Sequence, residues 1–512
     1  MNFKQIHNDG NDRNITIKIS CLLFFLSIII YKIFMISRPF NGDTYIYANS
    51  ISNFEGDIIH LGYYLIGSVF HFFLNLIGST PLLTMAYMSI FFGSLSVVCM
   101  FLFTLKLTGN RLQSFIAAMI LMFSAFFWYY SISGEVYVPQ LAVVLLTVLL
   151  IMHNRYLISG LLFLIAISIT PTSCLALPPI LYLMYIKNVK KKGLMLFILP
   201  IIISGVLLVI WDFSKIIGII NSAIFSPGVF IKNFSLKTLL VEVSYKLCIM
   251  VYGRSFNLMA FFAVWGFIIL YKNNKKNWLL MLSFLLPFLL YLFNLNLFSG
   301  DHLIISYITI SFLASCGVMH VLNASRNLFR FKYPILFFFT IIYILLSYNF
   351  LINSKTREAK EINRVIEKLS LEYNINSIMI SDYSFAIPFW YWHLIVNKRE
   401  PVIYSGNDSL KGAISEIYYS ITDLPYVIPD LNINQALDSK VIYIIERLEW
   451  QPWIIKQLLN ERILEDRKKK KSILNKLSKY WEKGVDEKFE ILKIIDSPLR
   501  PVYLLQRAKK EI

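Results

Sequence analysis

Acidic residues are scarce over the first two thirds of this chain. Residues 1–353 contain nine Asp and Glu against 23 Lys and Arg, whereas residues 354–512 contain 22 against 26. Cysteine is also rare. The five cysteines lie in or beside apolar runs and form no CxxC pair. This pattern excludes a disulfide scaffold and a thiolate metal site. Residues 354–512 also lack a glycine-rich phosphate loop, so nothing predicts a nucleotide site there.

The excess of positive charge lies in short loops between long apolar runs. The chain is 57% hydrophobic, with a mean hydropathy of +0.60, whereas soluble domains are roughly 45–50% apolar. The net charge of +18 therefore reflects the loops of a polytopic α-helical membrane protein, not a nucleic-acid partner. A transmembrane helix needs about 20 mostly apolar residues. We predict eleven of them, at residues 16–37, 82–105, 112–131, 136–152, 156–171, 173–186, 194–211, 247–271, 278–295, 303–323 and 333–352.

One further apolar stretch, residues 61–78, carries His71 and Asn75, and its placement decides the orientation of the chain. If it lies flat on the outer surface as an amphipathic helix, every basic cluster falls on the cytoplasmic side, as the positive-inside rule requires. If it crosses the membrane, all of them fall outside. We therefore predict a cytoplasmic N-terminus and an external C-terminus. The clusters are Lys106/Arg111, Arg155, Lys187/Lys190/Lys191/Lys192, Lys272/Lys275/Lys276 and Arg326/Arg330/Lys332.

The acids of the membrane part then fall on the external side. Asp43 follows the first span, Glu135 closes the third, and Asp301 with His302 precedes the tenth. Arg254 lies within the eighth span, close to its outer end. External loops tolerate acids, which explains much of this sorting. It does not explain why several acids stand at span ends, where ionisable groups usually face a watery cavity.

These residues are expected to reach one depth near the outer interface, and together they favour transfer chemistry. A carboxylate can take the proton of an attacking hydroxyl, and an arginine can hold a phosphate through two hydrogen bonds. Each also has a structural explanation. Asp43 could be a turn or N-cap residue, Glu135 could cap a helix, Arg254 could reach lipid phosphates, and His302 could be an interfacial polar group. We interpret the group as a site.

Three segments give the chain a resemblance to a known family. They are Asp43 followed by "HLGYYLIGSVFHF" from His60, "FWYYSISGEVYVPQLAVVLL" at 127–146, and "SITPTSCLALPPILYLMY" at 168–185. With them the chain resembles the polyprenol-dependent glycosyltransferases of the C-type (GT-C) fold, in the branch related to protein O-mannosyltransferases. The resemblance implies inverting transfer of a sugar from a polyprenyl-phosphate donor to a protein, lipid or glycan hydroxyl.

The resemblance also implies roles for individual residues. Asp43 is the base that activates the acceptor hydroxyl. Glu135 is a second acid, placed at the acceptor or at a divalent cation (Mg²⁺ or Mn²⁺) if one is used. The remaining substrate-binding residues that we infer are His60, Arg254, Asp301 and His302.

The last part of the chain has the pattern of a soluble α/β domain. Strands are expected within residues 377–382, 400–406, 440–447, 489–496 and 501–506, with helices between them, and they favour a mostly parallel sheet. We predict a cytoplasmic tail (1–15), a transmembrane domain (16–353) with a first external loop (38–81), and an extracytoplasmic domain (354–512). The expected location is the plasma (inner) membrane, in contact with its lipids.

Two other functions fit a chain of this class. A transporter or flippase for lipid-linked glycans predicts ionisable groups near the bilayer midplane and internal repeats, whereas here the acids gather at one end. A polymerase or ligase usually carries its large external loop between spans, whereas here the soluble mass is C-terminal. The sequence therefore favours the transferase.

Overall fold

The structure is a computed structural model that divides into two compact units. One comprises Met1–Ser37 and Ser50–Asn353, and the other comprises Arg38–Asn49 and Ser354–Ile512. Each unit is described by itself. The described residues are 10–36, 42–53, 60–205, 256–293, 300–324, 332–351, 360, 363–364, 366, 377–381, 403–405, 441–445, 489–495 and 502–507.

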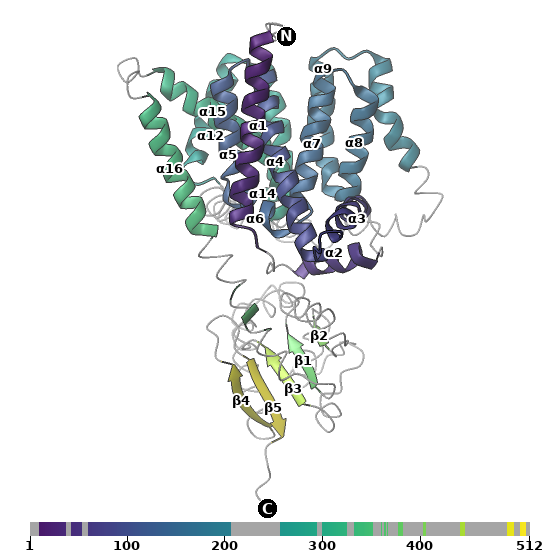
Figure 1. Ribbon diagram of the computed structural model, residues 1–512. Helices are drawn as coiled ribbons and strands as arrows, with labels where there is room; N and C mark the ends of the chain where they lie inside the picture. Colours follow the sequence, from purple (N-terminus) through teal and green to yellow (C-terminus); the bar gives the residue numbers. More distant parts are fainter. Residues whose placement is uncertain are drawn as a thin grey trace, which may run out of the picture. The chain divides into compact units, whose positions relative to one another are not determined.

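Helices form wherever the described sequence has a long apolar run (Figure 1). Up to residue 205 they are α1 (Gly10–Ile33), α2 (Gly42–Asn53), α3 (Leu61–Asn75), α4 (Pro81–Thr108), α5 (Arg111–Met122), α6 (Ala125–Ser133), α7 (Tyr137–Met152), α8 (Tyr156–Ile169), the 3₁₀ helix η2 (Pro171–Ala176), α9 (Leu177–Ile186) and a helix over residues 191–205. From residue 256 they are α12 (Met259–Asn273), α13 (Lys275–Phe284), α14 (Leu286–Phe293), η4 (Gly300–Ile305), α15 (Ser306–Ala324) and α16 (Lys332–Phe350).

Three described helices are long and apolar enough to cross a bilayer: Asp12–Ile33, Pro81–Thr108 and Leu303–Asn323. Several shorter apolar helices accompany them, which agrees with a multi-pass helical protein; the number eleven stays a prediction. The expected single span at 112–131 is wrong in one respect. It is broken after Met122, and its halves α5 and α6 are bent by 63°.

Local signals set the ends of the central helix α4. Thr80 precedes it with extended backbone and accepts a hydrogen bond from the Leu83 N–H, and Pro81 occupies the first helical position. Gly109 ends it with a φ of 66°, a left-handed conformation that glycine adopts without strain. The next cap is Asn110, whose side chain accepts from the Gln113 N–H and starts α5.

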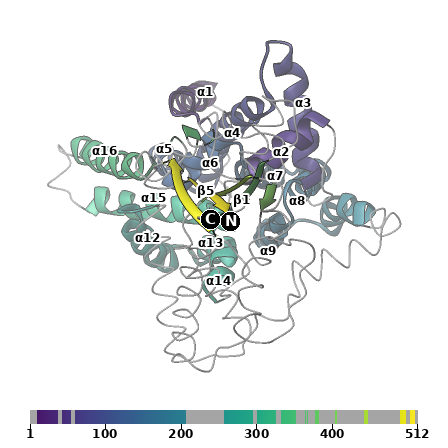
Figure 2. The ribbon, with the colours of Figure 1, turned by 90° about the horizontal axis from the view of Figure 1, so that it is seen from below.

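The first unit is a bundle in which α4 packs against α1, α5 and α7 (Figure 2). A second tight contact joins α12 to α15. A Cβ atom on Gly266 would lie 1.9 Å from the Leu313 carbonyl oxygen, and one on Gly317 would lie 2.1 Å from that of Phe262. The two backbones can approach this closely because both crossing positions are glycine.

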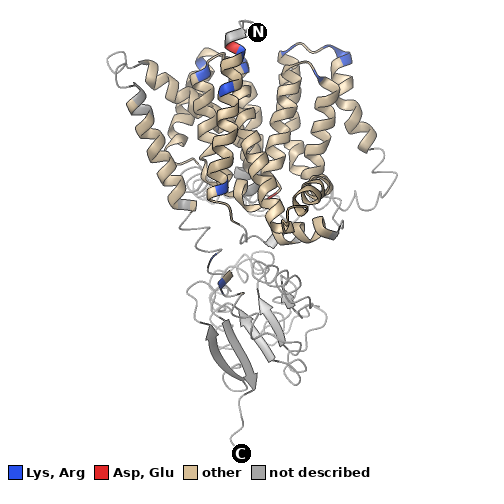
Figure 3. Ribbon diagram, viewed as in Figure 1, with Lys and Arg blue, Asp and Glu red and all other residues tan. Residues whose placement is uncertain are grey.

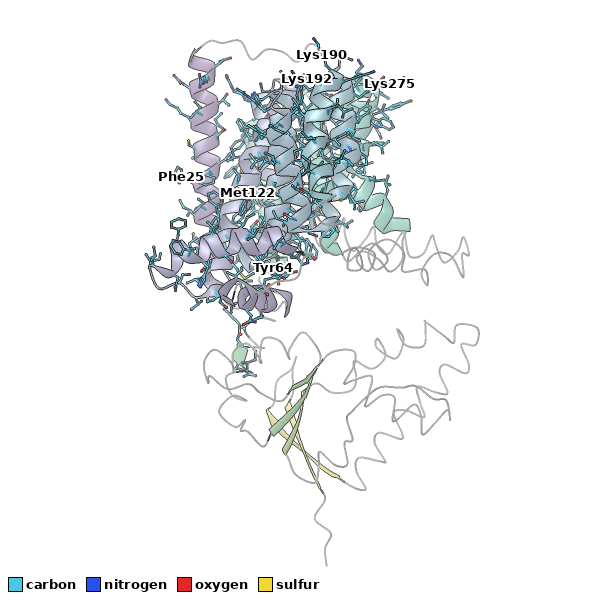
Figure 4. The ribbon with its side chains drawn as sticks, turned by 90° about the vertical axis from the view of Figure 1, so that its right-hand side faces the viewer. Phe25, Tyr64, Met122, Lys190, Lys192 and Lys275 are labelled. Carbon is cyan, nitrogen blue, oxygen red and sulfur yellow. The ribbon has the colours of Figure 1, made fainter. Side chains whose placement is uncertain are left out.

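Lysine and arginine gather at the end of the bundle where α1 begins (Figure 3). Lys190, Lys192 and Lys275 lie together at this end in Figure 4. Such segregation is what the positive-inside pattern requires. Arg326 and Arg330 lie outside the described residues. Lys32 is an exception, because it stands in the last turn of α1, where it donates to the Tyr87 hydroxyl.

Helix α3 runs across the bundle and presents two different faces (Figure 4). Tyr63, Tyr64 and Gly67 are buried on one face. The opposite face exposes a stripe of large apolar side chains, each more than half exposed: Leu65, Val69, Phe72, Phe73 and Leu76, the last just past the end of the helix. At 15 residues, α3 is shorter than a membrane span. This pattern favours the expected interfacial helix.

The second unit contains a five-stranded sheet in the order β2-β1-β3-β5-β4. The strands are β1 (Ser377–Ser381), β2 (Ile403–Ser405), β3 (Val441–Ile445), β4 (Phe489–Ile495) and β5 (Val502–Arg507). Each falls where a strand was expected, but the expectation of a mostly parallel sheet is wrong. β1 pairs in parallel with β2 and β3, whereas β5 is antiparallel to both β3 and β4. Only residues 496–501 join β4 to β5, too few for a parallel crossover. The helices expected between the strands lie outside the described residues.

Candidate functional site

Glu135 lies in the connection between α6 and α7 and is only 1% exposed. Helix α6 ends because Gly134 adopts a left-handed φ of 83°. Val136 is the N-cap of α7, so Glu135 stands beside the N-terminus of that helix, where a negative charge is favoured. A carboxylate this deeply buried is expensive unless nearby groups stabilise it. Its burial marks it as a candidate functional group.

Tyr63 of α3 is fully buried next to this connection. Its hydroxyl donates a hydrogen bond to the Gly134 carbonyl oxygen at 2.7 Å. Burial, followed by the charge of Glu135 and by Tyr64, raises the pKa of Tyr63 well above its usual value. Tyr63 therefore stays protonated, and its hydroxyl keeps donating to Gly134, the residue that precedes Glu135.

His60 holds the start of α3 against the end of α8. Its Nδ1–H donates to the Ile169 carbonyl oxygen at 2.7 Å. The helices are close here, since a Cβ atom on Gly62 would lie 2.1 Å from the Ser168 Oγ. Helix α8 begins at the end of the bundle where lysine and arginine gather, so its last residues lie at the opposite end (Figures 1 and 3). His60 is therefore at the same end as Glu135.

Gln140 adds a polar group that the sequence did not single out. It is fully buried in α7, and its Nε2 donates to the Thr172 Oγ1 of η2 at 3.1 Å. Its Oε1 is buried and has no hydrogen-bond partner among the residues that the structure describes. An acceptor left in this state costs about 1–3 kcal/mol. Gln140 is therefore an additional candidate for binding a substrate hydroxyl.

Asp301 and His302 belong to η4, which packs against α7, η2 and α15. Since η2 follows α8, the backbone of η4 lies at the Glu135 end of the bundle. Their side chains lie outside the description. Asp43 is the second residue of α2 and belongs to the other compact unit. An acid in the first turn stabilises a helix, so Asp43 also has a purely structural explanation. Arg254 lies outside the described residues.

The broken span α5–α6 is held by hydrogen bonds from distant helices. The buried Tyr31 hydroxyl of α1 donates to the Met122 carbonyl oxygen at 3.0 Å, and that of Tyr343 in α16 donates to Ile120 at 2.9 Å. These bonds satisfy carbonyl groups that the helix end releases. At the other end of α6, the Ile36 N–H donates to the Ile132 carbonyl oxygen. Tyr31 thus holds the break that precedes α6 and Ile36 holds the end of α6, so the helix that leads to Glu135 is fixed at both ends, whereas Tyr343 holds α5.

These tyrosines could not be singled out from the sequence, because each looks like an ordinary aromatic residue in an apolar run. Among the residues whose side chains are described, no three His, Cys, Asp or Glu side chains come together as a metal site would require. Asp43 and Asp301 are outside that set. Glu135 alone is not a ligand set for a cation.

Two solved structures resemble this arrangement over nearly the whole chain. ArnT from Cupriavidus metallidurans bound to undecaprenyl phosphate gives a TM-score of 0.55 at 8% identity, covering 97% of this chain and 98% of that chain. Its apo form gives 0.55 at 9% identity with the same coverage. The chain has the GT-C fold. This confirms the fold that the three sequence segments led us to expect.

A third structure with lower similarity is the archaeal oligosaccharyltransferase AglB from Archaeoglobus fulgidus, in complex with an inhibitory peptide and a dolichol-phosphate. It gives a TM-score of 0.49 at 14% identity, covering 96% of this chain and 74% of that chain. No protein-family model and no curated protein sequence matches the chain.

Proposed function

We propose that the protein is an integral membrane glycosyltransferase that moves a sugar from a polyprenyl-phosphate donor to a hydroxyl acceptor. One observation carries the proposal: a buried carboxylate, Glu135, between the end of α6 and the start of α7. These helix ends lie away from the end of the bundle where lysine and arginine gather (Figures 1 and 3). The similar ArnT structure is bound to undecaprenyl phosphate, which supports a lipid-linked donor. A buried charge that only capped a helix would be an expensive choice, since an uncharged cap serves equally well.

The proposed reaction is a single inverting displacement. The acceptor hydroxyl gives its proton to the Asp43 carboxylate while its oxygen attacks the anomeric carbon of the donor sugar. The bond from that carbon to the phosphate oxygen breaks on the opposite face. Polyprenyl phosphate leaves with the electron pair, and the configuration at the anomeric carbon inverts.

The other residues bind and orient the reactants. Glu135 acts at the acceptor, and Arg254 pairs with the donor phosphate, for which a guanidinium provides two parallel hydrogen bonds. His60, Asp301 and His302 bind substrate. The hydrogen bond of His60 to the end of α8 and the packing of η4 against α7 support a shared location for these three at the Glu135 end.

The reaction takes place at the outer face of the plasma membrane in this proposal. The gathering of lysine and arginine at the other end of the bundle supports a cytoplasmic N-terminus. Residues 354–512 then lie outside the cell and position the acceptor, which is a protein, a lipid or a glycan.

The proposal is tested by replacing Asp43 in cells. Wild type, Asp43→Asn and Asp43→Glu are brought to equal membrane levels, and glycans and lipid-linked sugars are analysed. We expect Asp43→Asn to lose product by about 10²–10⁴-fold, the usual contribution of a general base, while the lipid-linked donor accumulates. Asp43→Glu should keep part of the activity. Unchanged product and donor in Asp43→Asn would reduce Asp43 to a first-turn residue of α2 and favour a carrier.

A further inference from the structure

Three uncharged polar side chains meet at the turn between α8 and α9, and we name Thr170, Thr172 and Gln140 the Thr172 triad. The Gln140 Nε2 of α7 donates to the Thr172 Oγ1 at 3.1 Å, and the Thr172 Oγ1 lies 3.1 Å from the Thr170 Oγ1. Gln140 is fully buried and Thr170 is almost so, whereas Thr172 is partly exposed. Thr172 is therefore the member of the triad that a ligand can reach.

Local hydrogen bonds hold this turn in place. Thr170 has an extended backbone, and Pro171 begins the 3₁₀ helix η2 directly after it. The Ser173 N–H donates to the Thr170 carbonyl oxygen at 3.0 Å, and the Ser173 Oγ donates to the Ala166 carbonyl oxygen at 2.6 Å. The Thr172 hydroxyl thus stands on a fixed turn, and a preorganised group loses little conformational entropy when a ligand binds.

The depth of the turn in the membrane follows from the length of α8. With 14 residues, α8 spans about 21 Å, whereas the hydrocarbon core of a bilayer is about 30 Å thick. Since α8 begins at the end where lysine and arginine gather, the turn is expected within the outer part of that core. Irregular backbone at this depth occurs where it is packed in protein or lines a watery cavity. The helix η2 contacts α7, α8, α9 and η4, so the triad lies among the elements of the candidate site.

The hydrogen bonds of the triad leave the Thr172 proton for a ligand. A hydroxyl oxygen accepts two hydrogen bonds and donates one. The Thr172 Oγ1 accepts from the Gln140 amide and can also accept from the Thr170 hydroxyl. When both donate to it, its own O–H is directed away from the triad, and Thr172 makes no further hydrogen bond to a described residue.

The buried amide of Gln140 supports a role for this arrangement. Its Oε1 has no hydrogen-bond partner among the described residues, which costs about 1–3 kcal/mol. A leucine at this position of α7 would occupy similar space without burying a polar group. The amide is explained if its Nε2 holds the Thr172 hydroxyl in the orientation that a ligand needs.

We propose that Thr172 donates a hydrogen bond to a hydroxyl oxygen of the sugar on the lipid-linked donor, while Gln140 and Thr170 orient its proton. The triad is uncharged, which suits a sugar hydroxyl, whereas a phosphate group is held best by cations. Thr172 is thus a binding residue, and Gln140 is a positioning residue that acts through it. The inference rests on the proposed transferase function and adds a contact that selects the sugar.

The test compares the binding of two lipid probes to the purified full-length protein by native mass spectrometry. One probe is undecaprenyl phosphate, which carries no sugar, and the other is the lipid-linked sugar that accumulates in cells carrying Asp43→Asn. Thr172→Val removes the hydroxyl and keeps a side chain of nearly the same shape. It should bind the sugar-bearing lipid about 3- to 10-fold more weakly, the effect of one lost neutral hydrogen bond. It should bind undecaprenyl phosphate like wild type.

Three further variants accompany it. Thr172→Ser keeps the hydroxyl and should bind both probes like wild type. Gln140→Leu removes the amide that orients Thr172 and should weaken binding of the sugar-bearing lipid alone, which serves if Thr172→Val does not fold. Thr147→Val removes another buried hydroxyl, one that donates to the Val143 carbonyl oxygen within α7, and should change neither affinity.

The outcomes separate this inference from the proposed function. If the lipid-linked sugar accumulates in Asp43→Asn cells but Thr172→Val and Gln140→Leu bind it like wild type, the triad does not contact the sugar and the inference alone fails. Weaker binding of both probes by Thr172→Val would also overturn it, because the change would then act on the whole site and not on the sugar. If no lipid-linked sugar accumulates, the proposed function fails and this inference fails with it.

Discussion

Replacing Tyr63 with phenylalanine removes the hydroxyl that donates to Gly134, the residue that precedes Glu135. The variant loses the 2.7 Å hydrogen bond to Gly134 and leaves that carbonyl oxygen without this donor in a buried site. The expected loss of stability is about 1–3 kcal/mol. If Tyr63 fixes the connection that presents Glu135, transfer should also fall, and a misplacement worth about 1.4 kcal/mol at the transition state lowers the rate about tenfold.

Tyr343→Phe is the matched control, because Tyr343 is also buried and also donates to a backbone carbonyl oxygen, that of Ile120. It acts on α5, on the far side of the break from Glu135. Both variants are compared with wild type by thermal unfolding in detergent and by the ratio of glycan product to lipid-linked donor, at equal membrane levels. We expect similar losses of stability and a loss of transfer in Tyr63→Phe alone. Transfer that falls in both variants in step with stability would refute a positioning role for Tyr63.

Two further predictions concern the fold. Gly317→Ala places a Cβ atom 2.1 Å from the Phe262 carbonyl oxygen, so the α12–α15 contact has to open. Thermal unfolding should reveal a loss of stability of about 1–3 kcal/mol. Gly205→Ala, whose Cβ atom meets nothing described within 4 Å, should leave the stability unchanged, and equal losses in both variants would contradict the close approach of the two helices. Burial lowers the pKa of His71, which lies on α3 within 3.1 Å of the Thr84 hydroxyl. A folded pKa below the unfolded value of 6.5 means that stability is complete above that pH and is lost as the pH falls through the folded pKa. The melting temperature of wild type should therefore fall more steeply than that of His71→Gln below about pH 6.5, and parallel curves would assign the slope to other groups.

Residue patterns that are local in the chain were sufficient for much of the architecture. Apolar runs predict helices because a bilayer requires every backbone group to be paired within its segment. Alternating β-branched and aromatic residues placed the five strands correctly. The helix signal of residues 61–78 was also local, since its polar and small residues recur on one face.

The candidate site could be predicted only in part. The short motif "SGEV" marks a helix end followed by an acid, and an acid at the end of a membrane span is a functional candidate from sequence alone. The burial of Glu135 became visible only in the structure. His60 was chosen by resemblance, and the structure adds its contact with Ile169. Gln140 was missed because an amide in an apolar helix gives no periodic signal. The lack of a partner for its oxygen, among the described residues, can be seen only in the packed state.

The sequence by itself determined the class of protein, the segregation of its charges and the positions of its strands, because these follow from hydropathy and spacing along the chain. The tertiary structure decided the break between α5 and α6, the strand order of the sheet and the neighbours of Glu135. Tyr63 and Gly134 are 71 residues apart, and Tyr343 and Ile120 are 223 apart. Such pairs meet only after the helices have packed, since a single hydroxyl among apolar residues carries no information about which distant carbonyl group it will find.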